Sequence, residues 1–265
     1  MSVDPVDSVR GSFNADWVYS GLALVGLLAA WQLAAMALDN PLLLPTVMAT
    51  MEATMELLES GVLTGHAQAT LIRALVGFAL SAAVGIGLGI LMGTKGWAQF
   101  LFEPLISFGY PIPKIALYPI VLIVFGFGHL PKIVLVFAEC VIPVVIGAYY
   151  GVQNVNQDYV WAAQNMGASD WQIFSQVRLP ASLPYIFSGL RTALPIALIV
   201  AIVTEMISSQ EGLGYGIIRY SSSLQFDAMF GMFVAIAFIG YVFDLAIRLT
   251  RARLLFWAED VDTSM

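Results

Sequence analysis

Seven ionisable side chains lie within or near long apolar segments of this 265-residue chain, where a charge is costly. At the centre of a membrane-spanning helix, each such charge costs roughly 2.5–3.5 kcal/mol on insertion scales, so each should face protein or water rather than lipid. They are therefore candidates for ion pairing or for contact with a solute. These residues are Arg73, Glu103, Lys114, Glu139, Arg191, Glu205 and Asp244.

Lys114 follows a double-proline break and allows two interpretations. It could attract an anionic solute that passes nearby, or it could pair with a carboxylate such as Glu205 or Glu139, which is the favoured interpretation. Glu205, near the outer end of the fifth apolar segment, is open to the same two interpretations. Four residues are thus predicted to be pathway or intramembrane polar residues: Lys114, Glu139, Arg191 and Glu205.

Side chains that carry catalytic or metal chemistry are few and scattered. His66 and His129 are isolated in sequence from each other and from any carboxylate cluster. Cys140 is the only cysteine, which excludes an internal disulfide and a CxxC metal site. The sequence contains no GxxxxGK[ST] phosphate loop, so the chain cannot hydrolyse ATP itself. We therefore predict that the chain is not an enzyme and binds neither a metal nor a cofactor.

The composition is that of a protein embedded in lipid. Hydrophobic residues make up 59% of the chain and charged residues only 11%, against about 25% charged in soluble domains. The mean hydropathy is +0.84. The net charge of −7, without a basic run, does not suit nucleic-acid binding. The predicted fold class is an all-α membrane protein with about six transmembrane helices.

The six predicted spans form one membrane domain at residues 17–250. This domain lies between a polar N-terminal segment, residues 1–16, and a polar tail, residues 251–265. A bilayer core about 30 Å thick needs roughly 20 apolar residues per helical crossing. The predicted spans cover about 17–38, 67–92, 97–127, 133–150, 184–207 and 229–249.

Two segments depart from a simple span. The segment 97–127 is too long and proline-rich for one straight helix, and backbone groups freed by proline need partners in protein or in a wet cavity. It is predicted to line the pathway, with a purely structural kink as the alternative. The segment 46–60 places methionines on one side and glutamates on the other. It is predicted to be a helix that lies at the membrane interface or docks as part of a loop.

Small residues recur at every fourth position of the second span. Such a stripe lets two membrane helices approach closely, because packing rather than hydrophobicity drives their association. The alternative is that glycine is simply common in transmembrane helices. We predict a helix-packing stripe made of Gly77, Ser81, Gly85, Gly89 and Gly93.

The distribution of basic residues sets the predicted orientation. The loop 39–66 has four acidic residues and no Lys or Arg, which is typical of the outer side. The opposite side then holds Arg10, Lys95, Arg178, Arg248, Arg251 and Arg253. Both termini are therefore predicted to be cytoplasmic, which agrees with an even number of crossings.

The segment 153–180 is the longest polar stretch between spans and falls on the predicted cytoplasmic side. A short helix at Asp158–Met166 is followed by Gly167, which can adopt the positive φ that ends a helix. Ser169 and Gln172 match a capping box, so a second helix should begin at once.

Pro180 and Pro184 are predicted to end this second helix before the fifth span. The result would be a helical hairpin with bulky apolar side chains, which either dock into another protein or pack back against the helix bundle. These side chains are Trp161, Met166, Trp171 and Phe174.

This hairpin resembles the EAA motif of bacterial ABC importer permeases. The family pattern is EAA, three residues, Gly, nine residues, an aliphatic residue, any residue, then Leu-Pro. Every spacing is met, with Trp161 where the family often has Glu. The resemblance implies contact with an ATPase through Trp161, Ala162, Ala163, Met166, Gly167, Asp170, Trp171, Val177, Leu179 and Pro180.

Residues 43–257 resemble the nitrate/sulfonate/taurine/bicarbonate-type permeases in four motifs: Pro111–Ala116, Phe125–Gly128, Leu183–Arg191 and Glu211–Gly214. The resemblance implies a type I ABC importer permease fold with a cytoplasmic coupling-helix hairpin, in the bacterial inner membrane. It also implies a second permease copy, an extracytoplasmic substrate-binding protein, and ATPase subunits that hold ATP and Mg.

Two other classes remain as rivals at this stage. A secondary transporter would need an internal repeat with matching broken helices, and only one such break is visible. A membrane-embedded enzyme would need a cluster of His, Asp or Cys. The substrate is not readable: nitrate, sulfonates, bicarbonate and vitamin precursors all remain open, as does the identity of the second permease copy.

Overall fold

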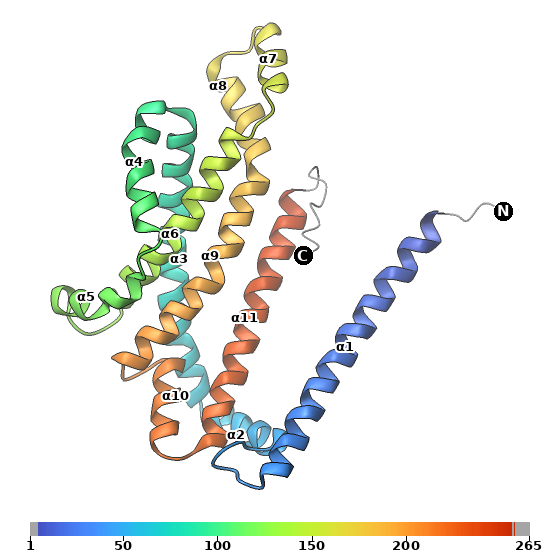
Figure 1. Ribbon diagram of the computed structural model, residues 1–265, viewed down its shortest axis with the longest axis vertical. Helices are drawn as coiled ribbons and strands as arrows, with labels where there is room; N and C mark the ends of the chain where they lie inside the picture. Colours follow the sequence, from blue (N-terminus) through green and yellow to red (C-terminus); the bar gives the residue numbers. More distant parts are fainter. Residues whose placement is uncertain (1–4, 256, 258–265) are drawn as a thin grey trace. The chain divides into compact units, whose positions relative to one another are not determined.

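The protein, seen in a computed structural model that describes residues 5–255 and 257, is built from helices joined by short connections (Figure 1). The α-helices are α1 (Pro5–Leu38), α2 (Val47–Glu59), α3 (Val62–Thr94), α4 (Gly96–Gly109), α5 (Tyr118–Phe125), α6 (Leu130–Gln153), α7 (Gln157–Asn165), α8 (Asp170–Ile173), α9 (Leu179–Ile207), α10 (Leu213–Ser222) and α11 (Phe226–Leu254). A 3-10 helix, η1 (Lys114–Leu117), precedes α5, and a π-helix, η2 (Phe174–Arg178), precedes α9. The prediction of an all-α membrane protein is confirmed.

Five helical stretches within the described residues are long and apolar enough to cross a membrane: Gly21–Leu38, Val62–Thr94, Leu130–Gln153, Asp170–Ile207 and Phe226–Leu254. A sixth crossing results if Gly96–Gly109 and Lys114–Phe125 count as one span, and these two helices are bent by 82°. The bend falls in the connection that carries Pro111 and Pro113, because proline lacks the backbone donor that would continue a helix. The predicted third segment is therefore a sharply broken one.

The helices form two compact units. One contains residues up to 63 together with 217–234, and the other contains residues 64–216 together with those from 235 on. In the first unit, α1 is tied to the start of α2: Trp31 Nε1 donates to Pro45 O at 3.0 Å, and Val47 N donates to Gln32 Oε1 at 3.0 Å.

Helix α2 docks through its small side chains. Thr50 and Ala53 are buried, whereas Met48, Met51 and Met55 are exposed on the opposite face. The helix is thus both docked and amphipathic, so the two interpretations of this segment are compatible.

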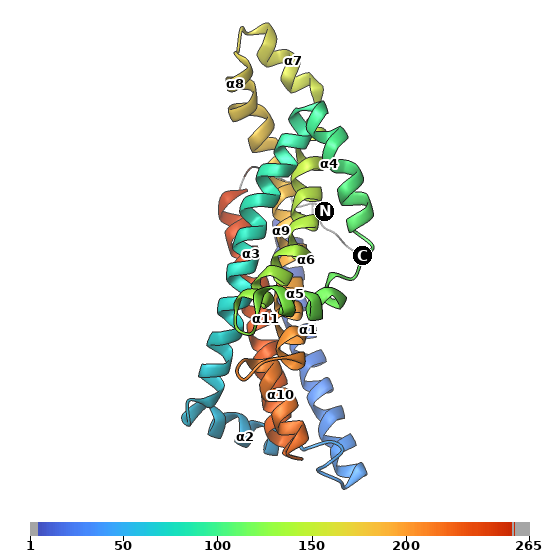
Figure 2. The ribbon, with the colours of Figure 1, turned by 90° about the vertical axis from the view of Figure 1, so that its left-hand side faces the viewer.

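In the second unit, α3, α6 and α9 lie side by side (Figures 1 and 2). The small-residue stripe of α3 lies directly against α6. A Cβ atom added to Gly89 would lie 2.6 Å from both Ala148 Cβ and Val145 O. Ser81 Oγ donates to Phe137 O across the same contact at 3.1 Å. Larger side chains on this face of α3 would therefore push α3 and α6 apart.

Helices α6 and α9 approach equally closely through three glycines that were not predicted to be packing residues. A Cβ atom added to Gly147 would lie 2.9 Å from Gly189 Cα, and one added to Gly189 would lie 2.8 Å from Pro143 O. Gly151 faces Ser182 O of α9 in the same way. Backbone contact thus fixes the spacing of α6 from both of its neighbours.

The prediction that Pro180 and Pro184 end the second hairpin helix is wrong. Helix α8, the π-helix η2 and helix α9 run on as one helical stretch, Asp170–Ile207. Pro180 closely follows η2, whose wider π-turn accommodates the missing N–H of the proline, and Pro184 lies inside α9. The second arm of the hairpin is therefore continuous with the fifth span.

Two glycines of α3 give a matched test of the packing stripe. Gly89→Ala should lower the free energy of unfolding by about 1–3 kcal/mol, because its Cβ overlaps α6. Gly87→Ala, whose Cβ would meet open space, should be neutral or up to about 1 kcal/mol stabilising. Unfolding of the purified protein in mixed detergent micelles measures both; equal stabilities would contradict close packing of α3 on α6.

Candidate functional site

The turn of the helical hairpin is closed by hydrogen bonds on both sides of Gly167. Gly167 has φ +79°, and the N–H groups of Gly167 and Ala168 donate to Gln164 O and Ala163 O at 2.9 and 3.0 Å. This is a Schellman motif, which satisfies the carbonyl groups left open at the end of α7. The positive φ predicted for Gly167 is confirmed.

The second helix begins immediately with the predicted capping box. Ser169 Oγ accepts from Gln172 N, and Gln172 Oε1 accepts from Ser169 N at 2.8 Å. A small apolar cluster of Val155, Val160 and Ile173 fixes the two arms against each other. Caps at the turn and a core at the base make the hairpin a stiff projection from the ends of α6 and α9 (Figure 1).

Three of the four predicted apolar side chains face away from the protein. The exposed fraction is 58% for Trp161, 87% for Met166 and 71% for Trp171. Phe174 is half-buried and packs on the Trp171 ring, with centroids 5.7 Å apart. Large exposed apolar side chains on a polar segment mark an interaction surface, so the first interpretation, docking into another protein, is the one that this geometry favours.

The remaining residues of the motif divide between surface and core. Ala162, Gly167 and Asp170 are exposed, like the apolar tips. The half-buried ones, by contrast, hold the hairpin together and join it to α9; these are Ala163, Val177, Leu179 and Pro180.

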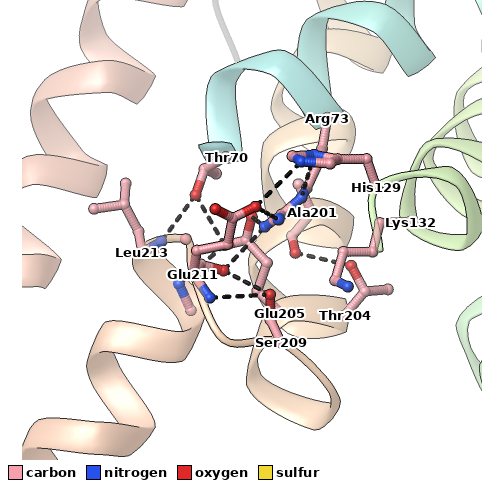
Figure 3. A network of polar contacts seen from close by, with 12 residues as sticks. Thr70, Arg73, His129, Lys132, Ala201, Thr204, Glu205, Ser209, Glu211 and Leu213 are labelled. Carbon is pink, nitrogen blue, oxygen red and sulfur yellow. Dashed lines mark hydrogen bonds and ion pairs between the residues drawn. The ribbon is translucent and has the colours of Figure 1, made fainter. Parts of the chain in front are cut away.

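A buried ion-pair network lies at the opposite end of α6 and α9 (Figure 3). Arg73 of α3 is at its centre, with side-chain exposure of 1%. Its Nη1 donates to Glu205 Oε1 and its Nη2 to Glu211 Oε1, both at 2.6 Å, and its Nε donates to His129 Nδ1 at 3.1 Å. One guanidinium therefore joins α3, α9, the loop after α9 and the loop before α6.

Glu205 is held on every side. Its carboxylate accepts from Arg73, from Thr70 Oγ1 at 2.8 Å and from Gly214 N at 3.1 Å. Gly214 permits this contact, because a Cβ atom there would collide with Ile202 O. The Glu211–Gly214 motif thus supplies a backbone N–H, that of Gly214, which binds the buried carboxylate of Glu205.

Of the other predicted intramembrane charges, Glu103 is exposed and accepts from Gln99 Nε2 at 3.2 Å, and the remaining four form ion pairs. Lys114 Nζ lies 3.5 Å from Glu139 Oε2, and Glu139 Oε1 also accepts from Ile115 N at 3.2 Å. Arg191 of α9 lies 3.4 Å from Asp244 of α11. Lys114 and Glu205 do not meet, since Glu205 pairs with Arg73.

The Arg73–Glu205 pair was not predicted from the sequence, because the two residues are 132 positions apart. A signal was present in the clustering of Thr70, Arg73 and Glu205 at apolar span ends predicted to share one side. Among residues 5–255 and 257, no group of three or more His, Cys, Asp or Glu side chains is placed to hold a metal ion.

Comparison with known proteins gives a family match and several full-length relatives. A family model described as "binding-protein-dependent transport system inner membrane component" matches residues 85–255. A probable ABC transporter permease protein of Brucella abortus is 32% identical, over 93% of this chain and 99% of the relative. The putative aliphatic sulfonates transport permease protein SsuC of Bacillus subtilis is 31% identical, over 98% and 95%. The taurine transport system permease protein TauC of Escherichia coli is 30% identical, over 91% and 90%.

Two solved structures share the fold. A chain of the MetNI methionine ABC transporter in an inward-facing conformation matches with a TM-score of 0.62 at 18% identity, covering 76% of this chain and 97% of that one. A chain from the crystal structure of an amino acid ABC transporter with histidines matches with a TM-score of 0.61 at 15% identity, covering 77% of this chain and 97% of that one.

The buried network predicts a large, partner-dependent cost of substitution. Arg73→Met should destabilise the protein by about 3–5 kcal/mol, because it leaves Glu205 charged and unpaired, and Arg73→Met with Glu205→Met should recover part of that loss. Lys114→Met, which breaks a half-buried pair, should cost much less. Thermal unfolding of the purified variants tests this; a double variant no more stable than Arg73→Met would contradict it.

Proposed function

This chain belongs to the binding-protein-dependent transport system inner membrane components, and on that premise we propose that it forms the solute pathway of an ATP-driven importer. The energy comes from ATPase subunits on separate chains, which hold ATP and Mg. A second permease copy completes the pathway, and an extracytoplasmic binding protein delivers the solute. Both termini lie on the cytoplasmic side of a bacterial inner membrane, with the hairpin on that same side.

The observation that carries this proposal is the exposed apolar tip of the hairpin. Trp161, Met166 and Trp171 are more than half exposed, yet the hairpin that carries them is capped and internally packed. Such a surface suits a cleft on a partner protein, where burial of aromatic and methionine side chains supplies binding energy. In permeases of this family, the partner expected at the EAA-like motif is an ATPase subunit.

The continuity of the second arm with α9 supplies a path for the motion. Displacement of the hairpin by closing ATPase subunits would act on the helical stretch Asp170–Ile207 without an intervening loop. Packed helices respond by moving between discrete arrangements rather than by bending continuously. Helix α9 would thus switch the pathway between outward and inward openings, together with α6 and the broken segment α4–α5.

The proposed cargo is a small polar or anionic solute. Two of the relatives, SsuC and TauC, are named for the transport of aliphatic sulfonates and of taurine, which both carry a sulfonate group. Lys114 lies at the break between α4 and α5 and forms a half-buried pair with Glu139 of α6, which also accepts from the backbone N–H of Ile115 in that break.

The role of Lys114 is tested with Lys114→Met. This variant is expected to have a lower folding yield and an unchanged affinity for the transported solute, and both quantities can be measured in one preparation. A weakened affinity would instead assign Lys114 to the pathway.

Coupling through the hairpin is tested at Gly167. Gly167→Val forces a β-branched residue into a left-handed conformation, which it adopts only with strain, whereas Gly167→Asn tolerates that conformation. In proteoliposomes containing the whole transporter, Gly167→Val should insert normally and retain ATP hydrolysis but lose about tenfold in uptake of the solute that co-purifies with the binding protein. Gly167→Asn should transport close to the wild-type rate.

Normal uptake by the Gly167→Val variant would count against the coupling role. Uptake driven by an ion gradient in vesicles that contain no ATP would support the rival function, a secondary transporter, and would overturn the proposal.

A further inference from the structure

A cavity of about 640 Å³ opens beside the Arg73 network, at the end of the second unit opposite the hairpin. Its walls come from α3, from the loop before α6 and the first turn of α6, and from the loop that follows α9. The residues that line it are Arg73, Phe127, Gly128, Lys132, Ser208, Ser209, Gln210 and Glu211. Most of these carry hydrogen-bonding groups, so the cavity suits a polar ligand.

Two buried cations face this cavity. Arg73 and Lys132 are each only 1% exposed. Lys132 Nζ donates to Gly128 O at 2.9 Å, and that bond uses one of the three N–H donors of the ammonium group. No carboxylate lies within ion-pair distance of Lys132 in the part of the chain that the structure describes. A buried ammonium group with spare donors at a cavity wall is a binding group for an anion.

The two carboxylates bound to Arg73 differ in how firmly they are held. The Glu205 side chain is fully buried and has three donors around it. The Glu211 side chain is 51% exposed and meets Arg73 and His129 Nε2, the latter at 3.2 Å. Glu211 can therefore leave Arg73 by side-chain rotation into solvent, whereas Glu205 cannot.

We propose that this cavity is an anion-binding subsite, in which a small oxyanion with one negative charge displaces the Glu211 carboxylate from Arg73 and is also held by Lys132. A sulfonate or a carboxylate fits this role, since one of its oxygens can accept from the vacated Arg73 Nη2 and another from Lys132 Nζ. The inference rests on the proposed function, because it places the subsite on the path of the transported solute.

The charges around the cavity balance in both states. With Glu211 bound, the formal charges of Arg73, Lys132, Glu205 and Glu211 cancel. Departure of the Glu211 side chain leaves an excess of one positive charge, which one monovalent anion restores to zero. Arg73 Nη2 has an anionic acceptor in both states, so the exchange avoids the cost of an uncompensated buried charge.

His129 adds a donor to the same exchange. Its Nδ1 accepts from Arg73 Nε, which places the proton of the neutral ring on Nε2, beside Glu211 Oε1. When Glu211 leaves, Nε2–H and Arg73 Nη2 point toward the same vacated position (Figure 3). Glu211 thus acts as an internal competitor that occupies the subsite until a solute anion replaces it.

Equilibrium binding of radiolabelled methanesulfonate to the full chain in phosphatidylcholine nanodiscs tests the inference. The wild-type protein should bind it saturably. Glu211→Gln should bind at least threefold more tightly, because the competing charge is removed, and Lys132→Gln should bind at least tenfold more weakly. Lys132→Arg should restore binding, and Arg248→Gln, which removes an exposed cation of the same unit, should bind like the wild type.

Three outcomes would overturn the inference: no saturable binding below about 100 mM, which is far weaker than the affinities of specific sites; unchanged affinity in Lys132→Gln; or unchanged affinity in Glu211→Gln. The result expected for Glu211→Gln is a gain of binding, so misfolding cannot imitate it.

Competition by phosphatidylglycerol against methanesulfonate would also overturn it, by identifying a lipid headgroup as the occupant. Failure of anion binding with ATP-driven uptake intact would remove this subsite alone. Failure of ATP-driven uptake with anion binding intact would instead remove the proposed function.

Discussion

Removing the carboxylate partners of a buried guanidinium is costly, and this constraint holds the second unit together at Arg73. The guanidinium has no exposure to replace its partners with water, so Glu205 and the loop that carries Glu211 must stay beside α3. Close backbone packing then sets the rest: the small-residue stripe of α3 lies on α6, and Gly147 of α6 lies on Gly189 of α9. Three helices are thereby fixed in register from one polar cluster.

The same helices carry the hairpin at their other end. Because Asp170–Ile207 is one helical stretch, Trp171 in the second arm of the hairpin and the Glu205 carboxylate belong to a single element. In the proposed function, this shared helix would carry a displacement from the hairpin, where an ATPase is proposed to dock, to the Arg73 network.

Local sequence signals predicted the features that depend on few neighbours. The turn and its caps were predicted from Gly167, Ser169 and Gln172, because backbone geometry and capping chemistry act within a few residues. The small-residue stripe of α3 predicted a close contact with another helix. The prediction that Pro180 ends a helix was wrong, since a π-turn accommodates a proline that a regular helix would not. The pairing of Arg73 with Glu205 was not predictable from spacing, because it depends on which span ends meet in three dimensions.

The central claim, that the hairpin faces the ATPase, is tested most directly by the side of the membrane on which its tip lies. In a chain with Cys140→Ala, Met166→Cys places a single thiol on the most exposed of the apolar tips. The account predicts that a membrane-impermeant maleimide labels this thiol in inverted vesicles and leaves it unlabelled in intact cells. Labelling in intact cells would put the hairpin outside, beyond the reach of any nucleotide-driven subunit, and would contradict the account.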